Sequence, residues 1–171
     1  MRVMLVSCAL ATLSATVILA QEPVIEIPDA IKPAPGLSRF LTATATGVQI
    51  YTCGRSDAGT PAWIFKAPEA QLFDPQQRQI GMHYAGPTWE ADDGGKVVGT
   101  VEASIPAPGG TAIPWLLLDV TSREGAGLFT GATAILRILT VGGLAPAQGC
   151  AAAQAGSERR VPYTAMYQFL K

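Results

Sequence analysis

The sequence contains few residues that could bind a metal ion or attract nucleic acid. It has one histidine and three cysteines in 171 residues. One cysteine lies in the expected N-terminal leader and the other two are expected to be oxidised to a disulfide, so no Cys/His zinc set can form. Twelve Lys and Arg residues face 13 Asp and Glu residues, and like charges form no run. DNA, RNA and anionic membranes all require a basic patch on the protein. We therefore expect no metal, no cofactor and no nucleic-acid partner.

Familiar catalytic motifs are missing as well. The chain has no G-x-S-x-G element of a serine hydrolase. The stretch GAGLFTG at residues 125–131 has the spacing G-x-G-x-x-x-G and no strand–helix–strand unit around it. A glycine-rich hairpin is therefore favoured over a dinucleotide loop. We do not expect an NAD-dependent dehydrogenase, and the sequence favours a protein without enzymatic activity.

The N-terminus has the layout of a secretory signal peptide. Arg2 supplies the positive charge, a mainly apolar stretch runs from Val3 to Leu19, and Ala20 stands before the expected cut. This pattern predicts a signal peptide over residues 1–20 and a secreted or periplasmic protein. The remaining chain should contain no membrane span.

The cysteines predict one disulfide. Cys8 would leave with the leader, so the exported chain keeps only Cys53 and Cys150. An even pair in an oxidising compartment is typical of a disulfide. A closed loop of this length is worth about 4.7 kcal/mol in the chain-entropy model.

The rest of the chain reads as one β domain. Residues 21–38 carry four prolines and should form an extended lead-in. Residues 39–171 contain short segments of alternating polarity separated by Gly and Pro, with a hairpin turn at DDGG, residues 92–95. This pattern predicts an all-β fold with little helix, either an antiparallel sandwich or a barrel. The segment at 131–143 fits a buried helix or strand, and its β-branched residues favour a central strand.

The stretch GMHYAGPTWEADDGG concentrates the candidate ligand-binding residues. They are polar or aromatic side chains on the same short segment: His83, Tyr84, Trp89, Glu90 and Asp92. The only histidine either makes a structural hydrogen bond or serves a site. The acidic side chains could offer oxygen ligands to calcium, but they lack the spacing of a calcium-binding EF loop, and a solvated turn is favoured.

Arg137 is a further candidate because it interrupts an apolar run. A charge inside such a run needs a partner, and Glu90, Glu102 and Asp119 are the acidic residues considered for this role.

The tryptophans offer another route to a ligand. Trp63, Trp89 and Trp115 each lie beside a proline or a polar loop. Exposed aromatic rings can stack on sugars or apolar ligands, whereas buried rings fill a core. For Trp115, within IPWLLL, the core is favoured, and for Trp89 both interpretations stay open.

Six blocks of sequence occur in an order that resembles a known family: QIYTC, APEAQLFD, GMHYAGPTWEADDGGKVVG, AIPWLLLDV, ILTVGGLAPAQGC and YTAMYQF. Together they resemble a family of secreted bacterial and fungal proteins, domain of unknown function 3455. Gly95 stands where a serine is usual, and Leu139 where an asparagine is common. The resemblance implies export and a single globular domain, but no activity or cofactor. Some fungal relatives carry a malate dehydrogenase label, which the residues here do not support.

Three hypotheses follow. The leading one is an exported β domain that binds a small molecule, a glycan or an envelope component. The second is a hydrolase or lyase in which His83 acts with Glu90 or Asp92. The third is a structural or host-interaction protein with an exposed apolar patch. The sequence does not fix the oligomeric state.

Overall fold

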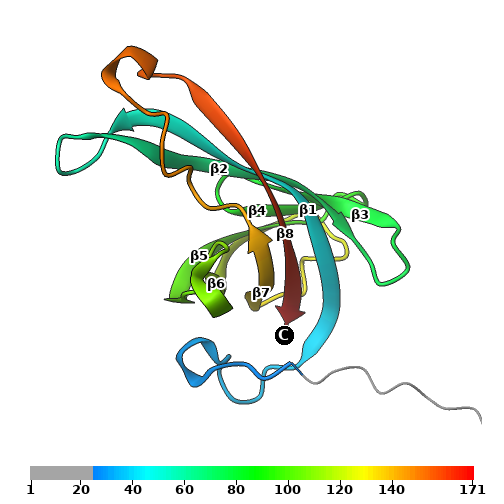
Figure 1. Cartoon of the computed structure of the whole chain (residues 1–171). Coiled ribbons are helices and arrows are strands. Elements are labelled where there is room, and N and C mark those ends of the chain that lie inside the picture. Colours follow the sequence, from blue (N-terminus) through cyan, green and yellow to red (C-terminus); the bar gives the residue numbers. More distant parts are fainter. Residues whose placement is uncertain (1–24) are drawn as a thin grey trace, which may run out of the picture.

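A computed structural model describes residues 25–171, and the predicted signal peptide lies outside these described residues. Eight antiparallel strands form a closed barrel, in which each strand pairs with its sequence neighbours and β8 pairs with β1 (Figure 1). The strands are β1 (Arg39–Arg55), β2 (Pro61–Phe73), β3 (Gln79–Tyr84), β4 (Thr88–Ala91), β5 (Lys96–Ile105), β6 (Trp115–Glu124), β7 (Ala134–Gly142) and β8 (Glu158–Leu170). The helical residues described are three short 3-10 turns: η1 (Asp29–Ile31), η2 (Pro108–Gly110) and η3 (Ala152–Gln154). The all-β prediction, with a barrel as one of its two forms, is confirmed.

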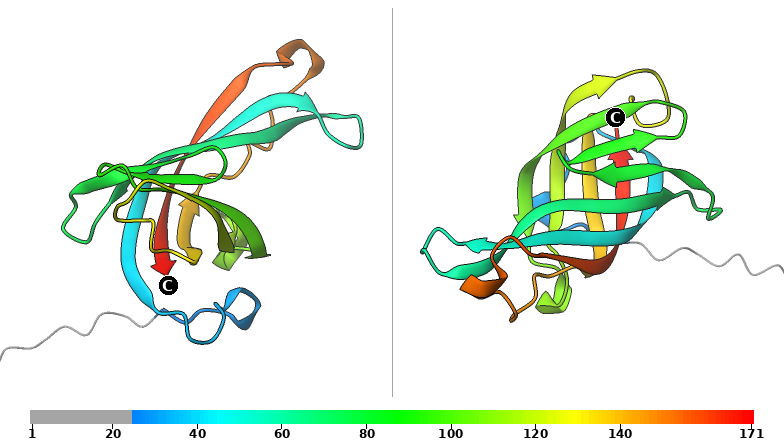
Figure 2. Two further views of the ribbon diagram at one scale, coloured as in Figure 1. Left: turned by 180° about the vertical axis from the view of Figure 1, so that it is seen from behind. Right: turned by 90° about the horizontal axis from the view of Figure 1, so that it is seen from above.

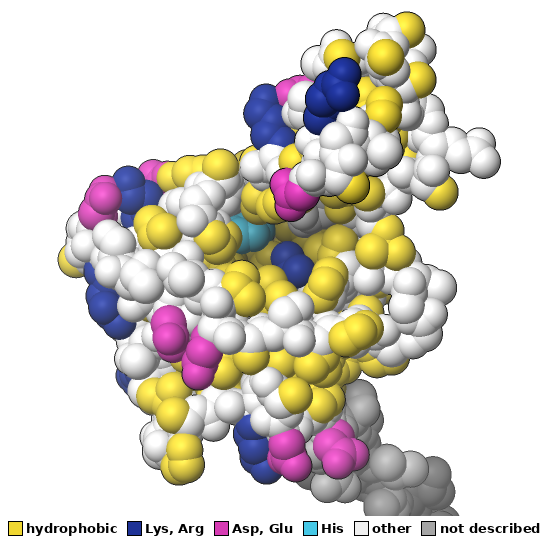
Figure 3. Space-filling view, turned by 90° about the vertical axis from the view of Figure 1, so that its left-hand side faces the viewer, with side chains coloured by type: hydrophobic (Ala, Val, Ile, Leu, Met, Phe, Trp, Pro, Cys, Tyr) yellow, Lys and Arg dark blue, Asp and Glu magenta, His cyan; other side chains and the backbone are white. Residues whose placement is uncertain are grey.

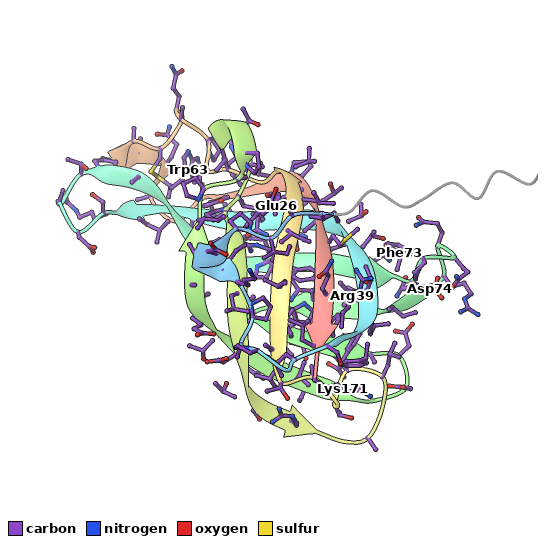
Figure 4. All side chains as sticks on the ribbon, turned by 90° about the horizontal axis from the view of Figure 1, so that it is seen from below. Glu26, Arg39, Trp63, Phe73, Asp74 and Lys171 are labelled. Carbon is purple, nitrogen blue, oxygen red and sulfur yellow. A yellow bond between two sulfur atoms is a disulfide. The ribbon has the colours of Figure 1, made fainter. Side chains whose placement is uncertain are left out.

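Three long strands extend past the barrel as an arm. The ends of β1, β2 and β8, together with the loop at 144–157, project beyond the shorter strands (Figures 1 and 2). The predicted disulfide between Cys53 and Cys150 is present there and ties β1 to this loop. Trp63, labelled in Figure 4, packs beside the disulfide, and its Nε1–H donates to the Gln148 carbonyl at 2.9 Å. The disulfide therefore holds together the part of the sheet that leaves the barrel.

The opposite end of the barrel is closed by the glycine-rich loop between β6 and β7. Phe129, at the centre of GAGLFTG, is fully buried and stacks on Phe169 of β8, with ring centroids 4.6 Å apart. The loop joins two antiparallel neighbours, as the hairpin prediction required. The main hydrophobic cluster therefore extends from this loop to Ala43 and Ala45 in the first half of β1.

The lead-in packs against the outside of the barrel wall. Ile31 is fully buried, and Ile25, Ile27 and Leu37 pack with it over the outward-facing side chains of β6 and β7. These two strands are therefore covered on both faces, which explains their nearly continuous apolar runs. The ambiguous segment at 131–143 is accordingly a strand, β7, as predicted.

The predicted turn at 92–95 joins β4 to β5, with the Ala91 N–H donating to the Gly95 carbonyl at 2.8 Å. Within residues 25–171, no helix is long and apolar enough to cross a membrane.

Candidate functional site

The half of the barrel lumen nearest the arm holds a cavity of about 500 Å³. Figure 3 shows the hollow, with mostly hydrophobic side chains around a histidine and a basic group. Its lining comes from all the strands: Gln49, Tyr51, Phe65, Lys66, Pro68, His83, Ala85, Gly86, Pro87, Trp89, Val101, Ile113, Pro114, Leu116, Leu118, Arg137 and Tyr167. Trp89 belongs both to this lining and to the main core, so it separates the cavity from the packed end.

His83 is fixed in one protonation state inside this wall. It is 2% exposed and stacks on its cross-strand partner Trp89, with ring centroids 4.5 Å apart. Its Nδ1 lies 2.8 Å from the Thr88 carbonyl, which can only accept, so Nδ1 carries the proton and Nε2 keeps its lone pair. Burial, helped by the nearby Arg137 charge, lowers the pKa of His83 to about 3. The imidazole is therefore neutral at physiological pH. It makes a structural hydrogen bond to Thr88 and also lines the cavity.

Arg137 lies half-buried at the same cavity, and none of the predicted acidic partners reaches it. Its Nε and Nη2 donate to the Pro114 carbonyl at 3.1 and 2.9 Å. No ion pair among residues 25–171 includes this guanidinium. The expectation of a pairing with Glu90, Glu102 or Asp119 is wrong, because these side chains are exposed whereas Arg137 lines the lumen. A backbone carbonyl satisfies two of its donors and leaves its charge uncompensated.

Four polar residues around Arg137 were not anticipated from the sequence. Tyr51 donates to the Gly143 carbonyl at 2.6 Å. Gln49 Nε2 and the hydroxyls of Tyr163 and Tyr167 are buried and have no partner in good hydrogen-bond geometry within the described chain, although they neighbour one another. Burial raises the pKa values of the three tyrosines, while the Arg137 charge acts in the opposite direction. The sequence did contain a pattern that could have identified them. In GVQIYTC and YTAMYQF, these residues occupy alternate positions, which face the same side of a strand.

Tyr84, Glu90 and Asp92 lie elsewhere, around a separate hollow. The Tyr84 hydroxyl donates to Glu90, and this bond raises the pKa of Tyr84. Glu90 also sits opposite Lys96 in the strand register, as in an ordinary cross-strand polar ladder. Odd-numbered residues of β3 and β4 face the lumen here, so His83 and Trp89 point inward while Tyr84 and Glu90 do not. The pairing of His83 with Glu90 or Asp92 that the hydrolase hypothesis requires is not formed.

The tryptophans are all buried. Trp63 packs in the arm, Trp115 packs under the lead-in, as favoured from the sequence, and Trp89 is 1% exposed. Of the two interpretations left open for Trp89, the structure supports the buried one, and each ring fills a different part of the core. Phe65 is the aromatic residue that stands exposed at the cavity, in edge-to-face contact with Tyr51.

The cavity lining lacks several of the side chains that enzymes commonly use. It contains no Asp, Glu, Ser, Thr or Cys side chain. Across residues 25–171, no three His, Cys, Asp or Glu side chains gather closely enough to hold a metal ion. The lining offers an apolar volume with two cations, of which Lys66 is paired with Glu158, together with several hydrogen-bond donors and one neutral imidazole.

Comparison with known proteins identifies a family but assigns no role. Comparison with curated proteins and with solved structures finds no match. The model of a family described as proteins of unknown function, DUF3455, matches residues 33–171, from the lead-in through all eight strands. The chain belongs to the DUF3455 family.

Proposed function

We propose that this protein is an exported, non-enzymatic binding protein that holds one small, largely apolar molecule in its barrel. The observation that carries the proposal is the cavity of about 500 Å³ in the lumen. Small-molecule sites typically occupy about 300–1,000 Å³, and an eight-stranded barrel has room for one small ligand. The disulfide is in keeping with an oxidising compartment outside the cytoplasm.

The lining favours a small molecule over a glycan. Sugars are recognised by exposed aromatic faces combined with many acceptors, whereas the lining here is mainly apolar and contains no carboxylate. Phe65 and Val101, 52% and 47% exposed, form an apolar rim at the entrance. Exposed apolar side chains at the mouth of an apolar cavity are stabilised when a ligand covers them.

The lining also favours binding over catalysis. A general base should have a pKa near the working pH, but the pKa of His83 is about 3. No carboxylate orients the ring, and no Ser, Thr or Cys lies in the cavity to act as a nucleophile. His83 is therefore suited to holding β3 and β4 together in the cavity wall, through Thr88 and Trp89, rather than to transferring protons.

A neutral fluorescent dye tests the proposal. N-phenyl-1-naphthylamine emits strongly only in apolar surroundings, so titration of the protein should give a saturable signal with one site per chain. Val101→Trp places bulk at the entrance and should weaken binding. Val141→Trp is the matched control, because Val141 is an exposed strand residue outside the cavity lining. The absence of saturable binding, or equal weakening by both variants, would refute the proposal.

A further inference from the structure

The cavity has an unusual electrostatic composition. Two cations line it, and Lys66 is paired with Glu158 at its edge. Arg137 has no acidic partner among residues 25–171, and the neutral His83 adds no charge. The cavity therefore carries a single uncompensated positive charge. A half-buried charge of this kind is normally compensated, because partial burial removes part of its hydration.

The remaining polar side chains of the cavity lie near Arg137 and lack well-formed hydrogen bonds. Gln49 and Tyr167 both line the cavity and are 2% and 0% exposed, yet Gln49 Nε2 and the Tyr167 hydroxyl have no partner in good hydrogen-bond geometry within residues 25–171, although Arg137 and Tyr163 lie beside the Tyr167 hydroxyl. Buried polar atoms are hydrogen-bonded in the large majority of cases. Arg137 adds further donors, since its Nε and Nη2 bind the Pro114 carbonyl and the rest of the guanidinium faces the cavity beside Tyr167.

A ligand that satisfies these groups must bring an acceptor and a negative charge. A carboxylate does both, because its two oxygens can accept from a guanidinium and from neighbouring N–H or O–H groups. The Arg137 charge acts on Tyr51, His83, Tyr163 and Tyr167, which places it among the polar side chains of the lumen. The rest of the ligand would contact aliphatic and aromatic side chains: Phe65, Trp89, Val101, Ile113, Leu116 and Leu118.

We infer that the cavity selects a small organic monoanion, a carboxylate on an apolar body, with its charged group against Arg137 and the donors of Gln49 and Tyr167. This inference rests on the proposed function and specifies the chemical class of its ligand.

Three eight-carbon compounds with different head groups test the inference: octanoate, 1-octanol and octylammonium. Each is used to displace N-phenyl-1-naphthylamine from the wild-type protein at about pH 7.5, where the carboxylate is ionised. Octanoate should displace the dye at a concentration about 10- to 100-fold lower than 1-octanol, as expected for charge-assisted hydrogen bonds. Octylammonium should be the weakest of the three. Equal potency of octanoate and 1-octanol, or a preference for octylammonium, would overturn the inference.

A pair of arginine variants assigns the preference to its residue. Arg137→Met should abolish the advantage of octanoate over 1-octanol and leave dye binding in place. Arg123→Met is the matched control, because Arg123 also donates from Nε and Nη2 to one backbone carbonyl, that of Ala132, but lies outside the cavity lining. It should keep the preference. Loss of the preference in both variants, or its retention in Arg137→Met, would count against the assignment.

The two proposals fail in different ways. If the dye does not bind the wild-type protein, the binding function falls and the ligand class falls with it. If the dye binds but the head groups are equivalent, the binding function stands and only the anion preference is lost. The wild-type comparison needs no variant, so it decides the question even where Arg137→Met does not fold.

Discussion

Acidification should destabilise this protein through a single residue, His83. In the folded chain the ring is buried, and its pKa is lowered to about 3 from an ordinary value of 6.5. Between these two values, the unfolded chain binds a proton that the folded chain does not. The stability due to this difference is fully present above about pH 6.5 and is lost as the pH falls toward 3.

The magnitude follows from the size of the pKa shift. Each pH unit within the window changes the free energy of unfolding by about 1.4 kcal/mol, so lowering the pH from 6.5 to about 5 should remove about 2 kcal/mol. This loss is a large fraction of the 5–15 kcal/mol typical of a folded domain. The window lies above the ordinary pKa values of Asp and Glu, so the histidine dominates the slope there.

Urea unfolding at several pH values between about 5 and 7 measures the effect. His83→Asn is the informative variant, because the asparagine amide can still donate to the Thr88 carbonyl but does not titrate. It should be less stable than the wild type at neutral pH, since the stacking on Trp89 is lost, yet nearly insensitive to pH in this window.

The single histidine also permits a direct measurement. His83 is the only such ring in the chain, so its NMR resonances need no assignment among several. The folded protein should show one neutral tautomer, protonated at Nδ1, from about pH 7 to about 5. A ring that titrates in the folded state with a midpoint near 6.5, or a His83→Asn variant with the wild-type pH slope, would refute the reasoning.

Two further predictions concern stability. Leu139→Asn should raise the free energy of unfolding by about 0.5–1 kcal/mol, because Leu139 holds a φ of 49° that asparagine tolerates better. Val141→Asn is the control on the same strand, and it should lower the free energy of unfolding because Val141 has no positive φ. Thermal melts in which Val141→Asn is the more stable variant would contradict the argument. Replacing Cys53 and Cys150 together by alanine should cost about 2–5 kcal/mol, measured by chemical unfolding against the oxidised wild type, and an unchanged midpoint would show that the loop they close adds no constraint.

Local signals in the sequence were enough to predict most of the fold. Alternating polarity marked the strands, the Asp-Gly-Gly pattern marked the turn at 92–95, and two remaining cysteines indicated the disulfide. The closure of the barrel depends on the pairing of β1 with β8, which are far apart in the sequence. No local pattern reports such a pairing, so a sandwich and a barrel could not be distinguished.

The site was only partly predictable for the same reason. His83, Trp89 and Arg137 were identified and do meet at one cavity, whereas Tyr84 and Glu90 were grouped with them although they lie on the other face of the same strands. Strict alternation across the β3–β4 hairpin would have separated the two sets. The partner of Arg137 was not predictable, because a backbone carbonyl of a distant loop leaves no trace in the side-chain sequence.

Gly95 has a structural reason for lacking a side chain. A Cβ at this position would lie 2.8 Å from the Cα of Gly127 in the loop that closes the barrel. Gly127 itself leaves no room for a side chain beside Asp93, whose carboxylate accepts from the Leu128 N–H at 2.8 Å. The two glycines thus bring the turn and the closing loop into direct backbone contact.

The division of the barrel into a packed end and an open end explains how it can hold a cavity without losing its stability. A barrel of eight strands normally fills its interior with side chains, and here only the half containing Phe129 and Phe169 is filled in this way. The lead-in, through Ile31 and its neighbours, buries the outer face of β6 and β7 as well. These two strands therefore bury apolar side chains on their outer face, and this stabilisation does not depend on how the lumen is filled. The open half needs fewer packing contacts, and its wall can carry Arg137 and unpaired donors that a filled core would exclude.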